Sequence, residues 1–204
     1  MRYALAVAAA FMAAPAFAAT APKVDMSGAT SCALNGFLTD KDPRGTNVRS
    51  GPSAAAPVVG HLPPDYSGAG SDETFAVEFT VIGSKDGWLL IKDSRTGQYG
   101  EGPQKTVFAG PGWISGGLVG FTLGSTVLRA GPTKADKLAA KLSYGAYGPD
   151  SYLVQRVHAC RGGAVDVTVV IAPSIDPKAK PVRGWARHAC GSQVTTCDAG
   201  GDAD

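Results

Sequence analysis

Short runs rich in apolar and β-branched residues recur along the chain, and they predict strands. Residues 76–82 are mostly apolar and β-branched, with Glu78 and Thr80 at alternate positions. Residues 165–171 form a nearly continuous β-branched run. Successive side chains of a strand point to opposite faces, so alternation of apolar and polar residues is typical of a half-buried strand. Short strands of this kind, separated by turns, predict an all-β fold.

Turn residues bound three shorter strands. Residues 47–49 are stopped by Gly51-Pro52, because proline fixes its own backbone and disfavours helix at the residue before it. Residues 88–91 follow a Lys-Asp-Gly turn that is typical of a hairpin. Residues 113–114 follow a Pro-Gly pair. Residues 133–142, which hold Lys and Ala, predict a helical turn or two, and no long helix is expected.

The chain repeats itself with an offset of about 80 residues. Residues 47–52 (Asn-Val-Arg-Ser-Gly-Pro) correspond to residues 127–132 (Val-Leu-Arg-Ala-Gly-Pro). Residues 81–91 correspond to residues 157–167 at an offset of 76, and Gly112-Trp113 corresponds to Gly184-Trp185 at an offset of 72. Three signals in the same order, with shrinking offsets, predict two copies of one unit that differ in loop length.

These motifs resemble those of the bacterial SH3 (SH3b) domain. The opening Asn-Val-Arg-Ser-Gly-Pro-Ser and the later Asp-Gly-Trp and Gly-Trp-Ile segments carry the resemblance in residues 32–120. Residues 121–197 match less well, with Leu128 in place of Val48 and Ala164 in place of Trp88. The resemblance implies two tandem SH3-like small β-barrels, a fold often exported alone or appended to enzymes, that bind cell-wall components or peptides. It implies no catalytic residues.

The first 18 residues have the three parts of a secretory signal peptide. Arg2 is followed by a short apolar run and by Ala16-Phe17-Ala18, an Ala-x-Ala cleavage site. The apolar run is too short to span a bilayer, and no later run approaches that length. We therefore expect an exported protein, periplasmic or extracellular, without a membrane span.

Composition and charge narrow the function classes. Gly and Pro number 27 and 14, which is high for a helical bundle. The formal net charge is only +2, whereas a nucleic-acid binder usually has a clustered basic excess. Lys134, Lys137 and Lys141 fall at helical spacing, but a solvated face explains them. We expect no nucleic-acid partner, and residues 198–204 are expected to be a disordered acidic tail.

Four cysteines in an exported chain favour two disulfides: Cys32, Cys160, Cys190 and Cys197. The first copy holds only one of them, so full pairing within the chain must link Cys32 to the second copy. We therefore expect a rigid tandem that is cross-linked by disulfides. The connectivity stays open, with a preference for a bridge from Cys160 to Cys190 or Cys197.

The tripeptide His-Ala-Cys occurs at residues 158–160 and again at residues 188–190. Two such strands could present two histidines and two cysteines to a zinc ion. Oxidation of the cysteines in an exported protein argues against this site and against a thiol nucleophile. A glycosidase needs two carboxylates at a defined separation, which the sequence does not show. No glycine loop follows a predicted strand and opens a helix, as phosphate binding requires. We expect no cofactor, no metal and no enzymatic activity.

Aromatic residues in predicted loops are the best binding candidates: Tyr66, Tyr99, Tyr144 and Tyr147. A tyrosine ring offers a flat apolar face and a hydroxyl, which suits peptide or glycan ligands. The alternative is that these rings cap the cores. Trp88 and Trp113 are expected inside. The sequence thus predicts a non-catalytic exported binding module for a cell-envelope ligand, either a peptidoglycan peptide or glycan or an envelope protein. The alternative is a structural or partner-binding envelope protein without affinity for the cell wall.

Overall fold

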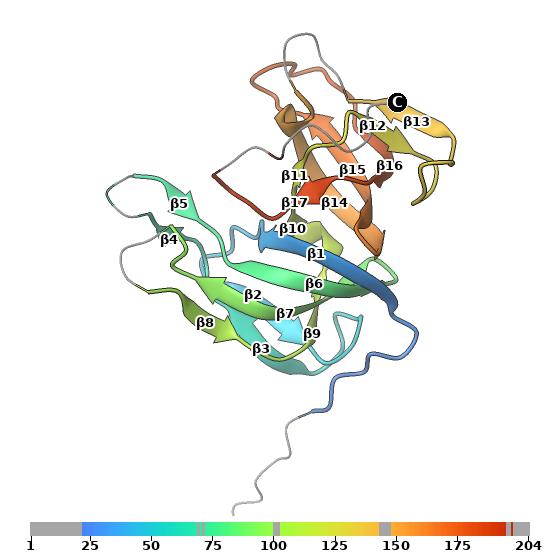
Figure 1. Ribbon diagram of the computed structural model, residues 1–204. Helices are drawn as coiled ribbons and strands as arrows, with labels where there is room; N and C mark the ends of the chain where they lie inside the picture. The colour runs from blue at the N-terminus through green and yellow to red at the C-terminus, as the bar shows by residue number, and fades with distance from the viewer. Residues whose placement is uncertain are drawn as a thin grey trace, which may run out of the picture.

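A computed structural model describes residues 22–68, 70, 72–99, 103–142, 148–194 and 197, and this part of the chain is all-β, without an α-helix (Figure 1). The predicted leader, residues 1–18, and the predicted tail, residues 198–204, lie outside the described residues. Two short 3-10 turns, η1 (Gly116–Leu118) and η2 (Pro149–Ser151), complete the structure. No helix within the described residues is long and apolar enough to cross a membrane.

The first sheet has eight strands in the order β10-β1-β6-β7-β9-β2-β3, with β8 paired to β7. A two-stranded hairpin, β4–β5, extends from the same half of the chain, and we call this half unit 1. Its strands are β1 (Thr30–Leu38), β2 (Thr46–Arg49), β3 (Val58–Leu62), β4 (Tyr66–Ser67), β5 (Thr74–Phe75), β6 (Glu78–Lys85), β7 (Trp88–Thr96), β8 (Lys105–Phe108), β9 (Gly112–Ser115) and β10 (Val119–Gly120).

The second sheet has five strands in the order β13-β12-β16-β15-β14. Together with the short pair β11–β17 it forms unit 2. Its strands are β11 (Thr122–Leu123), β12 (Val127–Arg129), β13 (Leu138–Lys141), β14 (Tyr152–Arg161), β15 (Ala164–Ile171), β16 (Val182–Ala186) and β17 (Ala189–Cys190). The helical turn predicted for residues 133–142 is wrong: a turn precedes strand β13 there, which pairs with β12.

The two units share a frame of five strands with the same order and register. β6-β7-β9-β2-β3 in unit 1 corresponds to β14-β15-β16-β12-β13 in unit 2. Arg49 pairs with Trp113, and Arg129 pairs with Trp185. The Nη1 atom of each arginine donates to a carbonyl seven residues further on, at 2.9 Å in unit 1 and 3.1 Å in unit 2. The repeat in the sequence is therefore a repeat in the structure.

Neither sheet closes into a barrel among the described residues, so the predicted barrels are not what the strand pairing shows. In unit 1 the outer strands are β10 and β3. β10 pairs with the end of β1, at Leu38 opposite Val119, and β11 pairs with β17 in the corresponding place of unit 2, at Leu123 opposite Ala189. The all-β class is confirmed, and each unit is built on one open sheet.

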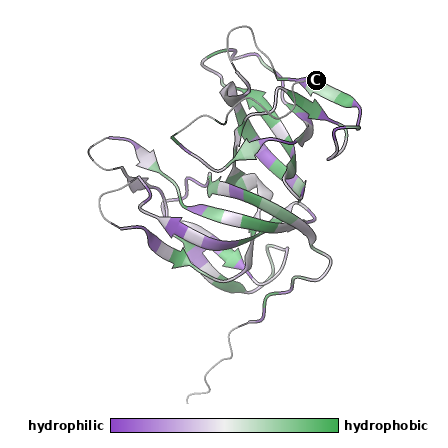
Figure 2. Cartoon of the chain, viewed as in Figure 1, coloured by the Kyte–Doolittle hydropathy of each residue, from purple (hydrophilic) through white to green (hydrophobic). Residues whose placement is uncertain are grey.

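One continuous apolar core runs through both units. Leu89 and Ile114 of unit 1 and Val157 and Val165 of unit 2 belong to the same packed cluster and are fully buried. The strands accordingly carry hydrophobic and hydrophilic bands side by side (Figure 2). Trp113 is fully buried as predicted, whereas Trp88 is only partly buried, because it sits beside the β6–β7 turn at the end of the sheet.

A disulfide and a buried hydroxyl join the units. Cys32 at the start of β1 is bonded to Cys160 on β14, which confirms that Cys32 links the two halves of the chain. The Oγ of Ser84 donates to the carbonyl of Cys160 at 3.1 Å and accepts from its N–H at 2.9 Å. A Cβ at Gly116 would lie 1.9 Å from the carbonyl oxygen of Val157, so only glycine allows this approach.

The second disulfide joins Cys190 to Cys197 across a separation of seven residues. The preference for a bridge from Cys160 to Cys190 or Cys197 is therefore wrong. The reason is packing of β14 against β1: the backbone around Gly162 exchanges hydrogen bonds with residues 31 and 33, and this places Cys160 beside Cys32. Two disulfides indicate that the chain folds in an oxidising, exported environment.

Candidate functional site

A polar cleft of about 460 Å³ lies where unit 1 meets the end of the chain. Its walls come from strand β1, from the neighbouring strands β6 and β7, from the connection between β7 and β8, and from the segment that begins at Cys190 in β17. The lining residues are Asn35, Glu78, Phe79, Thr80, Asp93, Arg95, Gln98, Tyr99, Gln104, Cys190, Gly191 and Ser192.

The sheet wall presents a row of polar side chains from neighbouring strands. Glu78 on β6 pairs with Arg95 on β7, and Thr80 on β6 pairs with Asn35 on β1. Residues paired directly across antiparallel strands share a face of the sheet, so these four side chains lie together. Arg95 and Asn35 are exposed, and Glu78 is half-buried. The wall thus offers acidic, basic and amide groups within one surface.

Asp93, in the same wall, has a strained backbone conformation. Its φ of 53° lies in the left-handed region that non-glycine residues rarely adopt. It stands beside the irregularity where β7 changes register against β6 and β8. Such bulges turn a side chain out of the regular alternation, and backbone strain of this kind concentrates at functional sites. The carboxylate of Asp93 faces Lys92 Nζ at 3.2 Å, and both side chains stay substantially exposed.

Tyr99 forms the aromatic wall of the cleft. Its ring packs on Phe75 with centroids 4.7 Å apart, and Tyr66 packs on the same phenylalanine at 6.1 Å. The Tyr99 hydroxyl donates to Glu78 Oε1 at 3.1 Å. Burial raises the pKa of this phenol, and the negative charge of Glu78 raises it further. Tyr99 therefore keeps its proton at neutral pH and remains a hydrogen-bond donor.

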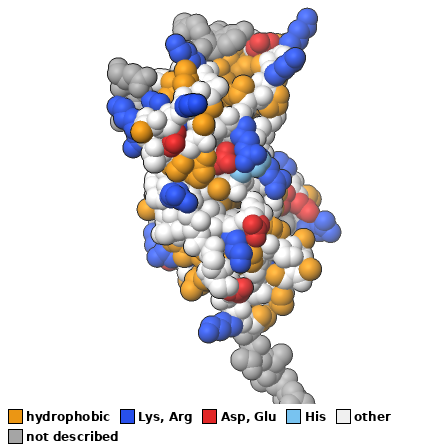
Figure 3. Space-filling model, turned by 90° about the vertical axis from the view of Figure 1, so that its right-hand side faces the viewer, with side chains coloured by type: hydrophobic (Ala, Val, Ile, Leu, Met, Phe, Trp, Pro, Cys, Tyr) orange, Lys and Arg blue, Asp and Glu red, His pale blue; other side chains and the backbone are white. Residues whose placement is uncertain are grey.

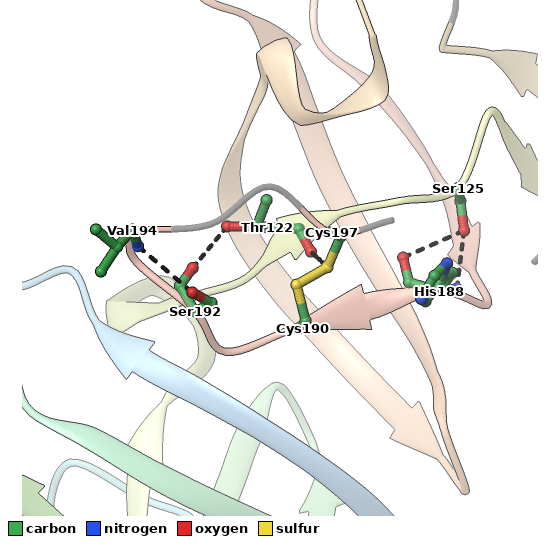
Figure 4. The surroundings of a disulfide bond; sticks show 7 residues. All are labelled: Thr122, Ser125, His188, Cys190, Ser192, Val194 and Cys197. Atoms are coloured by element: carbon green, nitrogen blue, oxygen red, sulfur yellow. Dashed lines mark hydrogen bonds between the residues drawn. A yellow bond between two sulfur atoms is a disulfide. The ribbon is translucent and has the colours of Figure 1, made fainter. Parts of the chain in front are cut away.

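Cys190, Gly191 and Ser192 form the opposite wall of the cleft. They belong to the C-terminal loop, of which residues 190–194 and 197 are described (Figure 4). The disulfide from Cys190 to Cys197 closes it, and Thr122 Oγ1 donates to the carbonyl of Ser192 at 2.9 Å. A Cβ at Gly191 would lie 2.6 Å from the backbone of Asn35, so this glycine lets the loop come against β1. The loop is held at both ends and rests on unit 1.

Gln193 anchors this loop to unit 1. Its Oε1 accepts from the N–H of Ala76 at 2.8 Å, and its Nε2 donates to the carbonyl of Ala76 at 3.0 Å and to Glu78 Oε1 at 3.1 Å. The side-chain amide therefore pairs with the backbone at the edge of β6 as a neighbouring strand would. Nothing in the local sequence marks Gln193 for this role, because its partners lie more than 100 residues away.

A second cavity of about 670 Å³ is lined by the next residues of the C-terminal loop. Gln193 and Val194 line it from the loop, and Asp72, Glu73 and Phe75 line it from unit 1. The loop therefore contributes residues to both cavities.

The predicted tyrosines have different places. Tyr99 lines the cleft. Tyr66 lines neither of the two cavities, and its hydroxyl is buried without a hydrogen-bond partner among the described atoms, so its ring serves packing on Phe75. Tyr144 and Tyr147 lie outside the described residues. One of the four predicted tyrosines therefore lines the cleft. The sequence analysis does not predict the polar residues that β6, β7 and the C-terminal loop contribute to it.

The repeated His-Ala-Cys segments do not come together as a metal site. All four cysteines are in disulfides, and the described residues hold no group of three His, Cys, Asp or Glu able to ligate an ion. His158 Nε2 is hydrogen-bonded to Thr168 Oγ1 at 2.8 Å. Burial lowers the pKa of His158, and the nearby Arg183 lowers it further. His188 lies apart, where its backbone N–H donates to Ser125 Oγ at 2.8 Å (Figure 4).

The geometry thus defines one composite cleft, built on unit 1 and closed by the disulfide-bonded C-terminal loop. Its lining is mostly polar and includes the rings of Phe79 and Tyr99, which suits a ligand with many hydroxyl or amide groups. Known proteins give no guide to that ligand: neither the scan against protein-family models nor the searches of curated proteins and of solved structures find a match to this chain.

Proposed function

We propose that this chain is an exported, non-catalytic binding protein, made of two SH3b-like units, that recognises peptidoglycan of the cell envelope in the composite cleft. The cleft itself is the observation that carries the proposal. Donors and acceptors of both charges surround one tyrosine ring there, and the walls come from elements held by strand pairing and a disulfide. A site with convergent polar groups on a rigid frame is typical of ligand recognition.

The chemistry of peptidoglycan fits this lining. Its sugars and its peptide stems carry hydroxyl, amide, carboxylate and ammonium groups. Arg95 can pair with a carboxylate, and Asp93 and Glu78 with an ammonium group. The ring of Tyr99 can stack on the apolar face of a sugar. The SH3b-like motifs and the two disulfides of an exported chain support the same reading.

Co-sedimentation with isolated peptidoglycan sacculi, over a salt series, tests the proposal. Asp93→Asn/Arg95→Gln changes one partly exposed and one exposed residue of the cleft. It leaves the backbone in place, because asparagine tolerates positive φ well. The control is Asp86→Asn/Lys105→Gln. Asp86 also has a positive φ, of 50°, but it belongs to the β6–β7 turn, and neither Asp86 nor Lys105 lines the cleft.

We expect the unmodified protein and the control to pellet with sacculi in 0.5 M NaCl. The cleft variant should lose about ten-fold in affinity, since each charge-assisted hydrogen bond contributes roughly 1.5–3 kcal/mol before solvent exposure reduces it. A protein that stays in the supernatant at low salt contradicts the proposal and favours an envelope protein that binds another protein. Equal pelleting of the cleft variant and the control places the wall-binding site elsewhere.

A further inference from the structure

In unit 1 the chain covers one of its own tryptophans with an extended segment. The N–H of Asp25 donates to the carbonyl of Ser50 at 2.7 Å, and the indole Nε1 of Trp113 donates to the carbonyl of Asp25 at 2.8 Å. Both backbone groups of Asp25 are therefore bound by the frame of unit 1. Trp113 is fully buried in consequence.

Unit 2 repeats this pair of groups. Trp185 occupies the register position of Trp113, because it pairs with Arg129 as Trp113 pairs with Arg49. Ala130 occupies the position of Ser50: the N–H of Ala130 donates to the carbonyl of Lys137 at 2.8 Å, and that of Ser50 donates to the carbonyl of Pro57 at 2.8 Å. The frame of unit 2 therefore presents an indole N–H and a backbone carbonyl in the arrangement that holds Asp25 in unit 1.

Unit 2 has no covering segment within the described residues. Trp185 is partly exposed and Ala130 is exposed. In that part of the chain, the indole N–H of Trp185 has no hydrogen-bond partner. Its nitrogen is not one of the buried atoms that lack a partner, so it can be reached from outside. Among the described residues, nothing fills the position in unit 2 that residue 25 fills in unit 1.

Charge distinguishes the two positions. Residues 32–120 hold seven Lys and Arg against nine Asp and Glu, whereas residues 121–197 hold ten against four. Arg183 is exposed and shares the face of Trp185 on β16, where its guanidinium is paired with Asp166 at 2.7 Å. Arg187, just beyond the end of β16, is exposed as well. Lys and Arg side chains are spread over the face of unit 2 seen in Figure 3. The basic excess of unit 2 as a whole therefore favours an acidic partner.

We propose that Trp185 and Ala130 form a docking site on unit 2 for an extended, acidic segment of a partner protein. The segment binds as residue 25 binds to unit 1, with one backbone carbonyl on the indole N–H of Trp185 and the preceding N–H of the same residue on the carbonyl of Ala130. The basic excess of unit 2 attracts the acidic side chains of the segment. This site is separate from the composite cleft, and it does not depend on recognition of peptidoglycan.

Two synthetic peptides test the site on the full chain. One has the sequence of residues 22–29, the segment that covers Trp113, and the other carries Lys23→Asp in the same sequence. The readouts are the ¹H–¹⁵N signals of the three indole groups during titration and the affinity from fluorescence anisotropy of labelled peptide. Trp185→Phe removes the indole N–H and keeps an aromatic ring, and Trp88→Phe is the matched control.

We expect the Trp185 indole signal to shift progressively during the titration. The Trp113 signal should stay in place, because the indole N–H of Trp113 already donates to the carbonyl of Asp25. The acidic peptide should bind about three-fold or more tightly than the unmodified one at low salt. Trp185→Phe should weaken binding about five-fold, the effect of one net hydrogen bond, and Trp88→Phe should not.

Three results would overturn the proposal: an unmoved Trp185 signal at about 1 mM peptide, a Trp113 signal that moves alone, or equal affinity of Trp185→Phe and the unmodified chain. Equal affinity for the two peptides would overturn the acidic specificity. Sacculus pelleting of the Trp185→Phe protein should match that of the unmodified chain, so a failure at this site is distinguishable from a failure at the cleft.

Discussion

Unit 1 and unit 2 have the same five-strand frame, but their surroundings differ. In unit 1 the long strand β1 extends the sheet, residues 22–29 run beside Trp113, and the β7–β8 connection builds a cleft wall. In unit 2 the corresponding strand β11 has two residues, and Trp185 is partly exposed. The difference teaches that the repeated residues specify strand order and register, while the insertions and chain ends create the places where ligands can bind.

The shared frame depends on few residues. Val48 and Leu128 fill corresponding fully buried positions, and an arginine follows each of them at an irregularity in strand pairing. These arginines bridge to the next turn with matching hydrogen bonds. Such a frame tolerates changes at its surface, so one unit can be acidic and carry a cleft while the other is basic.

The two disulfides should differ most in their contribution to stability. Cys32→Ser/Cys160→Ser should lower the free energy of unfolding by about 4–5 kcal/mol, because that bridge closes a separation of 128 residues. Cys190→Ser/Cys197→Ser should cost about 2–3 kcal/mol for its separation of seven residues. Equilibrium unfolding in urea measures both. Equal losses, or a larger loss from the second pair, would mean that the first bridge does not hold the units together.

The corresponding tryptophans should differ next. Trp113→Ala should destabilise the chain by about 3–5 kcal/mol, because it empties a fully buried position and leaves the carbonyl of Asp25 without its donor. Trp185→Ala should cost about 1–2 kcal/mol, since its side chain is partly exposed. Thermal unfolding of the two variants checks the order. If Trp185→Ala were as damaging as Trp113→Ala, the position in unit 2 would be a core position and not an open one.

Two buried serines test which hydrogen bonds hold the two units together. Ser84→Ala should cost about 1–3 kcal/mol, because its hydroxyl satisfies both backbone groups of Cys160. Ser94 is the matched control: it is fully buried in unit 1, and its hydroxyl has no partner among the described atoms. Ser94→Ala should leave the free energy of unfolding nearly unchanged or raise it slightly. Equal effects of the two substitutions in urea unfolding would exclude Ser84 as a link between the units.

Between pH 7.5 and 5.5, a small pH effect should come from His158 in unit 2. The pKa of His158 is lowered by burial from its ordinary 6.5, so folding favours the neutral ring. Its contribution is therefore complete above about pH 6.5 and is lost as the pH falls below that value. In unit 1 the corresponding position of the repeat is Ile82, which does not titrate. We expect Tm to fall by a few degrees or less between pH 7.5 and 5.5, and His158→Gln to reduce that fall. An identical pH profile in the variant would assign the effect to other groups.

Sequence patterns predict the frame well, because its determinants are local. The Asn-Val-Arg motif at residues 47–49 and the Gly-Trp pairs at 112–113 and 184–185 lie in paired strands with matching registers. Parity of the cysteines predicts the link from Cys32 to the second copy, which the structure confirms. The helical turn at residues 133–142 is wrong, because pairing of β13 with β12 overrides the helix preference of Lys and Ala.

The site could not be predicted, because its walls come from distant parts of the chain. Gln193 reaches residues 76 and 78, and the segment 190–192 faces strands β1, β6 and β7. No local pattern encodes these approaches. The preference for a bridge from Cys160 to Cys190 or Cys197 is wrong for the same reason, since proximity of β14 to β1 decides the pairing. Whether the units are members of the SH3b family stays a prediction.

The most direct test of the account is an NMR titration of the protein with soluble peptidoglycan fragments, followed by the backbone amide signals of both units. The account predicts perturbations that cluster at the composite cleft, at Thr80, Gln98, Tyr99 and Gly191, while amides of the corresponding strands β14 and β15 in unit 2 remain unmoved. Perturbations centred on unit 2, or none with millimolar fragments, would contradict the claim that the additions to unit 1 create the ligand site.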